Sequence, residues 1–419
     1  MPITAVHVAN FKGLLESRKL ELRPLTIFIG ANSSGKSSCI HALAALAQTA
    51  RRENDRRPLV LDDETALVHL GRFIEVQHSK SYKDTITLGV DVSDVRWTER
   101  GPEVRRPTSQ VSPGSCVFTF KCARRTQEIK ILRAEYTIGP HIYSAVPKLN
   151  GTIEVVHKAS GARLLMTQSF GFGMQFAPFR QKDIQIYLEH FAPLVALINA
   201  AGTQLRGVVY LGPFRQAPQR RYATRGSAPR DVGPQGEASI ALLANETIRT
   251  RKRIHKKQVA AWLRVLHLAK EFEVTRLGSS DLFDVTMTLD DGATLPLADL
   301  GYGLSQVLPV LVQCSFAESR STLLFEQPEL HLHPIAAKKL VKVFIQTIKE
   351  KSVRIVAETH SIDLFQQLLS ELRNGSIALE DVAVYRVERA GSCSAIEKVD
   401  IDPETFDAYG LWNKGIITE

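Results

Sequence analysis

Two glycines, a lysine and a hydroxyl side chain stand at a fixed spacing between Gly30 and Ser37, where the chain reads G-x-x-x-x-G-K-S. Gly30 and Gly35 allow the backbone to curl, so that successive N–H groups point inward and can surround a phosphate group. Lys36 has the reach to contact the β- and γ-phosphates of a nucleotide, and the hydroxyl of Ser37 can ligate Mg²⁺. The pattern therefore predicts a phosphate-binding loop.

The segments on either side of this loop are the ones that such a loop requires. The apolar run Leu25–Ile29 before it predicts a buried strand, and apolar residues after it recur at helical spacing. A helix over residues 38–50 would turn its positive N-terminal end toward the phosphates. We therefore expect ATP and Mg²⁺ as ligands. The loop residues expected to bind the nucleotide are Gly30, Asn32, Ser33, Ser34, Gly35, Lys36, Ser37 and Ser38.

Two further apolar runs end in side chains that can do chemistry. Residues 322–325 lead into Glu326, whose carboxylate can hold Mg²⁺ through its water shell, with Ser37 as the other expected metal ligand. Residues 353–357 lead toward His360, whose neutral imidazole can contact the γ-phosphate or orient the attacking water. The alternatives are a carboxylate that only caps the next turn and a histidine with a structural role.

A glycine turn precedes a third apolar segment, ADLGYGLSQVLPVLVQ at residues 298–313. Gly301 and Gly303 flank the turn, and Ser305 and Gln306 begin the predicted helix. A glycine turn at a helix start is suited to bind an anion, although a simply capped helix is the alternative. Its place shortly before the Glu326 strand favours the anion site.

In this order, the phosphate loop, the GYGLSQ segment, the Glu326 strand and His360 resemble the ABC-type ATPase heads. The opening ITAVHVANFKG and the loop LTIFIGANSSGKSS are similar to single-chain AAA/ABC ATPases of the RecF and SMC kind. EQPELHLHP and ETHSIDLF resemble the overcoming-lysogenisation-defect and Septu/PARIS-type anti-phage defence branches. YLGPFRQAPQRRY at 210–222, VGPQGE at 232–237 and YGLWNKGI at 409–416 look like a subgroup of defence-associated ATPases.

The resemblance implies an α/β fold: a P-loop NTPase, with an ABC-type head, an inserted antiparallel β subdomain and a helical signature lobe. We expect an N-terminal lobe over 1–235, the signature lobe over 236–319 and the rest of the ATPase core over 320–419. It also implies ATP hydrolysis and a nucleotide-linked homodimer or higher oligomer, with GYGLSQ of one subunit facing the phosphate loop of another. An effector protein encoded nearby, such as a nuclease, is the expected partner, in anti-phage defence or DNA maintenance.

The chain departs from the ABC pattern where the general base usually stands. The usual Asp-Glu pair is replaced by Glu326-Gln327, and a glutamine cannot accept a proton from water. Glu329 is the nearest replacement, so we expect slow turnover with Glu329 assisting. The signature reads GYGLSQ and not LSGGQ, and Gln77 is only a candidate for the glutamine that senses Mg²⁺.

Two other classes of protein remain open. One is a metal-dependent nuclease of the overcoming-lysogenisation-defect kind, but only 59 residues follow His360, and their acidic residues lack the layout of a TOPRIM domain. The other is an inactive, nucleotide-gated scaffold, which Gln327 suggests. His331 and His333 have no third ligand nearby, and we assign them to the loop after the Glu326 strand rather than to a metal.

The net charge of +9 permits a nucleic-acid partner without proving one, because the charge is spread over many segments. A protein interface is an equal alternative for the basic stretches. Five scattered cysteines, no apolar run near the roughly 20 residues of a membrane span and no secretory signal favour the cytoplasm, without a membrane. The basic stretches are Arg215, Arg220, Arg221, Arg225 and Arg230 in a loop and residues 249–257 on a predicted helix.

Periodicity and turn signals predict the remaining elements. We expect a mostly antiparallel β region over 72–170, with 71–78 extended and 102–114 a loop. Helices are predicted over 182–201, 237–270, 304–316, 334–349 and 364–372, with a loop over 212–236. A hairpin is predicted around Asp291-Gly292, and another, of strands 382–388 and 394–399, around Gly391.

Overall fold

The computed structural model of the chain describes residues 2–52, 57–99, 108–148, 152–167, 175–176, 186–224 and 227–409. It consists of two compact units. Unit 1 comprises Met1–Leu22, Ser33–Val208 and Glu388–Ala395, and unit 2 comprises Arg23–Asn32, Val209–Val387 and Ile396–Glu419. The chain therefore passes from unit 2 to unit 1 inside the phosphate loop, between Asn32 and Ser33. The three-part division expected from the sequence stays a prediction.

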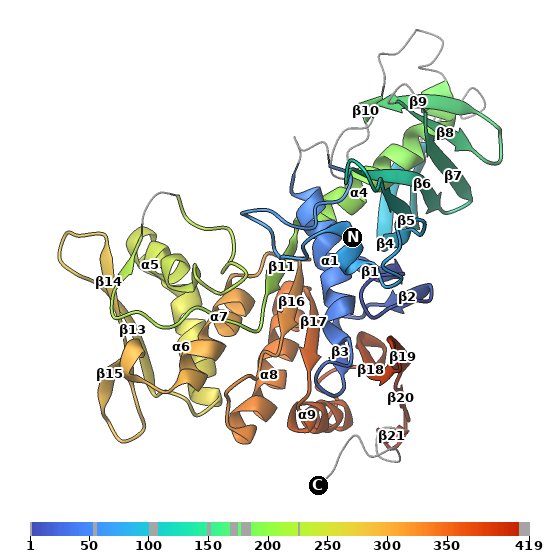
Figure 1. Cartoon of the computed structure of the whole chain (residues 1–419). Coiled ribbons are helices and arrows are strands. Elements are labelled where there is room, and N and C mark those ends of the chain that lie inside the picture. The colour runs from blue at the N-terminus through green and yellow to red at the C-terminus, as the bar shows by residue number, and fades with distance from the viewer. Residues whose placement is uncertain are drawn as a thin grey trace. The chain divides into compact units, whose positions relative to one another are not determined.

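An antiparallel sheet dominates unit 1, with nine strands among its described residues in the order β10-β9-β8-β7-β6-β5-β4-β1-β2 (Figure 1). In β1 and β8, buried and more exposed residues alternate for most of their length, as expected for strands with one face on a core. The expected antiparallel β region is confirmed. The strands are β1 (Ile3–Ala9), β2 (Arg18–Glu21), β4 (Ile86–Glu99), β5 (Thr108–Cys122), β6 (Ile129–Ile138), β7 (His141–Pro147), β8 (Thr152–His157), β9 (Arg163–Thr167) and β10 (Gln175–Phe176).

The loop expected over 102–114 is wrong from residue 108 onward, because β5 already begins there, while residues 102–107 lie outside the described chain. Pro113 suggested a turn. In the structure it faces a register shift between Val92 and Val95 of β4, where the regular ladder is interrupted. A strand tolerates proline at such an irregularity, because no ladder hydrogen bond is lost there.

Two long helices pack among the described residues of unit 1. α4 (Ala192–Arg206) covers β4, β5 and β6 with an apolar stripe that includes Leu194 and Leu197. A short π-helical segment, η1 (Tyr187–Phe191), precedes it, so the predicted helix over 182–201 is confirmed from residue 187, and residues 182–185 lie outside the described chain. α1 (Lys36–Ala50) contacts α4, β1 and β4.

The expected extended segment over 71–78 is wrong, because α2 (Phe73–Val76) forms a single helical turn there. At its start the backbone N–H of Arg72 donates to the carboxylate of Glu75 at 2.7 Å. This bond satisfies a backbone donor at the start of the helical turn, which favours the turn over the β-propensity of the apolar residues.

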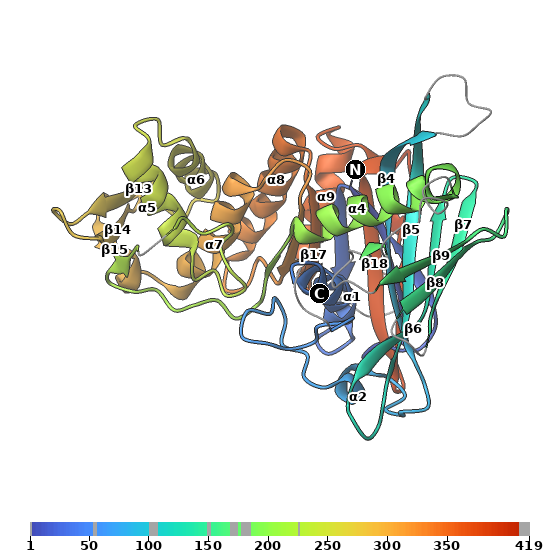
Figure 2. The same cartoon turned by 90° about the horizontal axis from the view of Figure 1, so that it is seen from above.

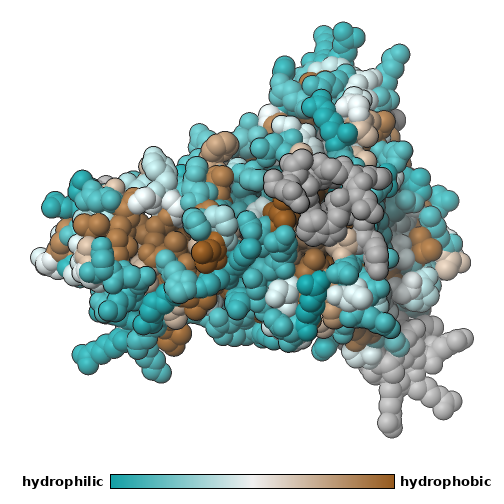
Figure 3. Space-filling model, turned by 90° about the horizontal axis from the view of Figure 1, so that it is seen from below, coloured by the Kyte–Doolittle hydropathy of each residue, from teal (hydrophilic) through white to brown (hydrophobic). Residues whose placement is uncertain are grey.

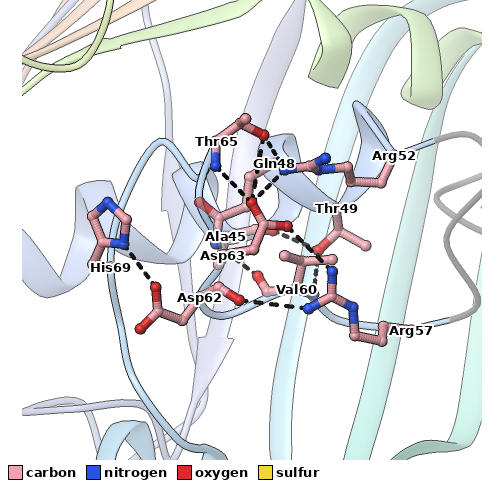
Figure 4. Close-up of polar contacts among 10 residues, drawn as sticks. All are labelled: Ala45, Gln48, Thr49, Arg52, Arg57, Val60, Asp62, Asp63, Thr65 and His69. Carbon is pink, nitrogen blue, oxygen red and sulfur yellow. Dashed lines mark hydrogen bonds and ion pairs between the residues drawn. The ribbon is translucent and has the colours of Figure 1, made fainter.

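Residues 60–68 are tied to the last turns of α1 by buried side-chain hydrogen bonds (Figure 4). Gln48 donates to the carbonyl of Val60 at 2.7 Å and accepts from the N–H of Val68 at 3.1 Å. Thr49 accepts from the N–H of Val60 at 2.9 Å. Arg52 pairs with Asp63 on the same segment. These bonds make residues 60–68 part of the packing around α1.

Unit 2 is built on a second sheet with the order β11-β16-β17-β3-β18-β19. The pairs β16/β17, β17/β3 and β3/β18 are parallel, and β3 and β16 are buried along their whole length, as expected for strands covered on both faces. The strands are β3 (Leu25–Ile29), β11 (Val208–Leu211), β16 (Thr322–Glu326), β17 (Arg354–Thr359), β18 (Val382–Ala390) and β19 (Cys393–Lys398), followed by the short pair β20 (Asp400–Ile401) and β21 (Ala408–Tyr409). The predicted final hairpin is confirmed.

Helices α8 (Pro334–Lys351) and α9 (Ile362–Arg373) pack on each other, and α8 also contacts β3 and β17 (Figure 2). Helix α7 (Tyr302–Phe316) follows the short η2 (Leu297–Asp299) and contacts α5, α6 and α8. These three elements match the predicted helices over 304–316, 334–349 and 364–372. Another short helical turn, η3 (Leu379–Asp381), leads into β18.

The remaining lobe of unit 2 is not purely helical. β13 (Glu271–Arg276), β14 (Leu282–Thr288) and β15 (Thr294–Pro296) form a meander that β12 (Tyr222–Ala223) joins, and the hairpin at Asp291-Gly292 is confirmed. β12 also interrupts the predicted loop over 212–236.

The helical stretch expected over 237–270 is confirmed over most of its length, but as two helices. The chain forms α5 (Ser239–Arg249) and α6 (Ile254–Val265), and Arg253 between them has a left-handed backbone, with φ of +47°. The basic stretch 249–257 therefore spans a helix break. Figure 3 shows hydrophobic residues gathered on the face of this lobe, at the left where Figure 1 draws α5, α6 and β13–β15. No helix among the described residues is long and apolar enough to span a lipid bilayer.

Candidate functional site

The part of the phosphate loop that lies in unit 1 has a backbone conformation that favours glycine at residue 35. Gly35 has φ of +102°, and helix α1 begins at the next residue. A Cβ on Gly35 would lie 2.0 Å from Oγ of Ser394, and a Cβ on Gly13 would lie 2.3 Å from the same atom. Ser394 is held there by its N–H, which donates to the carbonyl of Gly13 at 2.7 Å. The positive φ therefore strains any other residue at Gly35, and an added Cβ would also require the hydroxyl of Ser394 to move.

The polar side chains of this half-loop suit a phosphate group. Ser34 and Lys36 are each 3% exposed, and the hydroxyl of Ser34 has no hydrogen-bond partner in the described part of the chain. The first turn of α1 carries no acidic residue that would neutralise its positive end. A buried, unsatisfied donor at a helix N-terminus is a fit for an anionic oxygen. Ser38 is also buried, and Ser37 is half-buried.

In unit 2 the neighbouring parallel strands β16, β17 and β3 end close to the residues that were predicted to act on the nucleotide. Glu326 of β16 is in register with Glu358 of β17, and Thr359 is in register with Ile29, the last residue of β3. The phosphate loop begins directly after Ile29. The strands that lead to Glu326 and His360 therefore end in the same part of the sheet as the strand that enters this loop.

Glu326 is fixed by two residues that come from another part of the chain. The hydroxyl of Tyr210 donates to Oε1 of Glu326 at 2.8 Å. The guanidinium of Arg215 donates to the carbonyl of Glu326 at 2.9 Å and to the carbonyl of Gln327 at 3.2 Å. All of these partners except Gln327 are at most 8% exposed.

The turn after β16 brings Glu329 back against the end of β17. Gln327 has a left-handed backbone, with φ of +44°, and its N–H donates to the carbonyl of Glu358 at 2.9 Å. The hydroxyl of Thr359 donates to Oε1 of Glu329. Oε2 of Glu329 is buried without a hydrogen-bond partner among the described residues. Glu329 thus presents one uncommitted carboxylate oxygen beside the strand ends.

Burial and charge set the protonation states of this cluster. Burial lowers the pKa of Arg215 to about 10, opposed by the charge of Glu329 and by Tyr210 and Glu326. Arg215 therefore stays charged at neutral pH. Burial, together with the charge of Glu326, raises the pKa of Tyr210 far above its usual range, so its hydroxyl remains a donor.

His360 follows β17 directly and is exposed, and its imidazole makes no hydrogen bond within the part of the chain that the structure describes. The next residue, Ser361, caps α9 by accepting from the N–H of Leu364 at 3.3 Å. His333 has a similar capping role, because its ring nitrogen accepts from the N–H of Ile335 at the start of α8. A contact of His360 with nucleotide therefore stays a prediction, whereas His333 caps the start of α8.

The GYGLSQ segment is packed more tightly than its proposed role suggests. Ser305 and Gln306 are 5% and 4% exposed, and the hydroxyl of Ser305 donates to the carbonyl of Tyr302 at 2.8 Å. A Cβ on Gly303 would lie 2.4 Å from the carbonyl oxygen of His331. Gly303 is needed because α7 approaches the turn after β16 so closely. A contact of Ser305 and Gln306 with nucleotide in another subunit stays a prediction.

Three residues of the site, Tyr210, Arg215 and Glu358, were not predicted from the sequence as site residues. Glu358 was overlooked although it stands between the apolar run and the predicted His360. Tyr210 and Arg215 were noticed only as part of YLGPFRQAPQRRY, and Arg215 only as a basic residue. The signal for Tyr210 and Arg215 was a short apolar strand, β11, that contains Tyr210 and is followed by Gly212. Gln77 in unit 1 is 1% exposed, and its amide nitrogen has no partner among the described residues, which keeps it a candidate.

The two units carry the parts of a P-loop ATPase of the ABC type, with an inserted antiparallel sheet and a signature lobe. Comparison with family models agrees: residues 1–135 match the AAA ATPase domain. Residues 210–365 match the model described as "AAA domain, putative AbiEii toxin, Type IV TA system". The chain therefore carries AAA ATPase domain sequence over these two stretches, in agreement with the resemblance to AAA/ABC ATPases. No curated protein matches the sequence.

Solved structures similar to this chain include SMC heads. The SMC head domain from Thermotoga maritima is 11% identical, with a TM-score of 0.39, and covers 96% of this chain and 100% of its own. The Smc head from Pyrococcus furiosus bound to the C-terminal domain of ScpA is 9% identical, with a TM-score of 0.45, and covers 96% and 97%. An SmcHead bound to the C-winged helix domain of ScpA is also 9% identical, with a TM-score of 0.44, and covers 96% and 98%.

Proposed function

We propose that this protein binds ATP with Mg²⁺ and hydrolyses it slowly, and that nucleotide closes a homodimer or higher oligomer that controls a partner. The observation that carries the proposal is the set of strand ends in unit 2. Glu326 and Glu329 are gathered at the ends of β16 and β17, beside the strand that leads into the phosphate loop. Carboxylates at this place in a P-loop fold serve the metal and the attacking water.

Each residue then has a role that its surroundings support. Lys36 and Ser37 of the loop hold the phosphates and the metal, and Glu326 holds the metal through its water shell. Glu329 accepts the proton of the attacking water, because Gln327 at the usual position of the base cannot. His360 is exposed directly after β17 and senses the γ-phosphate. Slow hydrolysis lets the ATP-bound form persist until a trigger arrives.

The direct test is binding and turnover by the purified chain. Lys36→Ala should remove most ATP affinity, because a buried lysine that pairs with phosphate contributes a charge-assisted interaction. Lys349→Ala, an exposed lysine near the end of α8, is the matched control and should bind ATP as the wild type does. Unchanged binding in Lys36→Ala would refute the nucleotide site.

An inactive, nucleotide-gated scaffold is the second candidate, favoured by Gln327 alone. ATP binding without turnover, even over hours, would select it. A metal-dependent nuclease is tested by incubating the chain with plasmid DNA and Mg²⁺ or Mn²⁺, where cleavage would overturn the first proposal. The description of the matched family model as a putative AbiEii toxin supports a role in anti-phage defence. The partner that we propose is an effector encoded nearby, such as a nuclease.

A further inference from the structure

We infer that Arg215 and Tyr210 are positioning residues for hydrolysis: they hold the turn from Glu326 to Glu329 in the geometry that the metal and the attacking water require. The inference rests on the proposed function and adds to it the residues that keep its carboxylates in place. Neither residue belongs to the phosphate loop, the carboxylate strand or the signature segment. Both lie at or just after β11, more than a hundred positions earlier in the chain.

Arg215 hydrogen-bonds to the backbone of the turn and not to a side chain of it. Its two terminal nitrogens reach two successive carbonyls, those of Glu326 and Gln327. A guanidinium can make such a forked contact because its donors are rigid and planar, whereas a lysine ammonium is a single point. The side chain is 8% exposed, so water does not compete freely for these carbonyls.

The turn depends on these hydrogen bonds from Arg215 because its backbone is strained. Gln327 adopts φ of +44°, in the left-handed region that glycine tolerates and a glutamine rarely enters. Strained residues at functional sites persist only when their surroundings hold them. If Arg215 lost its hydrogen bonds to the two carbonyls, the peptide after Glu326 could relax from the left-handed conformation, and Glu329 would move with it.

Tyr210 acts on the carboxylate itself. Its hydroxyl donates to Oε1 of Glu326, and both groups are buried. The bond selects one orientation of the carboxylate, as outer partners do for metal ligands in general. Arg215 and Tyr210 together therefore fix the backbone and one side chain of the same turn from outside it.

The decisive experiment is a double-mutant cycle on ATP turnover at saturating Mg²⁺. Arg215→Lys keeps the charge but not the fork, and it should lower kcat about 10- to 100-fold, as small displacements of catalytic groups do, with little change in KM. If Arg215 acts through Glu329, adding Arg215→Lys to Glu329→Gln should cost little more than Glu329→Gln alone. A residue that only stabilises the fold would lower both rates by the same factor.

Arg276→Lys is the matched control. Arg276 also donates to two backbone carbonyls of a turn, those of Ser279 and Ser280, but on an exposed hairpin. It should leave kcat unchanged. Wild-type kcat in Arg215→Lys, or a full multiplicative loss in the double variant, would overturn the inference while leaving the proposed function intact. A wild-type chain that does not hydrolyse ATP would overturn both.

Tyr210→Phe covers the case in which Arg215→Lys does not fold, because it removes one hydroxyl and keeps the ring. It should raise the Mg²⁺ concentration for half-maximal turnover several-fold, since Glu326 loses its fixed orientation. Tyr222→Phe, which removes a hydroxyl that accepts from the N–H of Gln219, should not. An unchanged Mg²⁺ dependence in Tyr210→Phe would contradict the role given to Tyr210.

Discussion

Thr359, the last residue of β17, donates its hydroxyl to Oε1 of Glu329, which lies thirty positions earlier in the turn after β16. The other oxygen of Glu329 has no partner among the described residues. The hydrogen bond from Thr359 fixes the orientation of this carboxylate, and its second oxygen can still accept a proton or a hydrogen bond. That is the arrangement a general base needs before its substrate arrives.

Glu329→Gln should therefore reduce ATP turnover strongly while ATP binding persists, because an amide cannot take the proton of water. General-base assistance is typically worth about 10²–10⁴-fold, so the loss is measurable by phosphate release. Gln327→Glu tests the alternative that no base replaces the missing one, since it should then raise a slow wild-type rate. Fast turnover that survives Glu329→Gln would contradict the assignment of the base.

Gly35→Ala should abolish tight ATP binding and lower the unfolding temperature. The substitution adds a methyl group at φ of +102°, and that group would meet Oγ of Ser394 at 2.0 Å. Both the strained backbone and the overlap oppose it. Ser394→Gly in the same chain should relieve the overlap but not the strain, so it should restore the unfolding temperature only in part. Full recovery of binding in the double variant would show that conformation at Gly35 is unimportant.

Much of the site could be predicted because its parts lie at the ends of fully buried parallel strands. Such strands read as short apolar runs, and the chemistry stands directly after each run, as in Glu326 and His360. The α/β fold, the loop between β3 and α1 and the antiparallel region follow from the same local patterns. They needed no knowledge of which distant segments meet.

The features that could not be predicted depend on contacts between residues that lie far apart in the sequence. Tyr210 contacts Glu326 across 116 positions, and Ser394 packs on Gly13 and Gly35 from the far end of the chain. No local pattern encodes such partners, because the folded sheet alone brings them together. The break at Arg253 was missed for another reason: the basic residues on either side of it are good helix formers, and the break appears only in the backbone.

Nucleotide should increase the sedimentation coefficient of the wild type if the GYGLSQ segment closes an oligomer. Ser305 is buried and bonded to its own helix, so Ser305→Arg would disturb α7 itself. Tyr302, in the first turn of α7, is 65% exposed and offers a cleaner probe. Tyr302→Arg should prevent the ATP-dependent increase while ATP binding persists. Ile248→Arg, an exposed apolar residue on α5, is the control, and an oligomer indifferent to ATP would contradict the mechanism.

The last prediction concerns acid stability of unit 1, through Asp91 of β4. Oδ1 of Asp91 lies 2.7 Å from Nε2 of His7, and Oδ2 lies 2.8 Å from Nζ of Lys19, so one carboxylate ties β4 to β1 and β2. Burial alone would raise the pKa of Asp91, but hydrogen bonds from His7, Lys19 and Ser115 outweigh it and hold the pKa at about 2. The ionised form is therefore favoured by folding.

Because the pKa is lower in the folded chain than the usual 3.8, this stabilisation is complete above that value. It is lost as the pH falls toward about 2. The difference corresponds to about 2 kcal/mol of unfolding free energy at neutral pH. Asp91→Asn should lose about that much at pH 7 and show a flatter dependence between pH 4 and pH 2, by urea unfolding. The exposed Asp84→Asn should behave as the wild type. Equal acid sensitivity of Asp91→Asn and wild type would mean that other carboxylates govern acid unfolding.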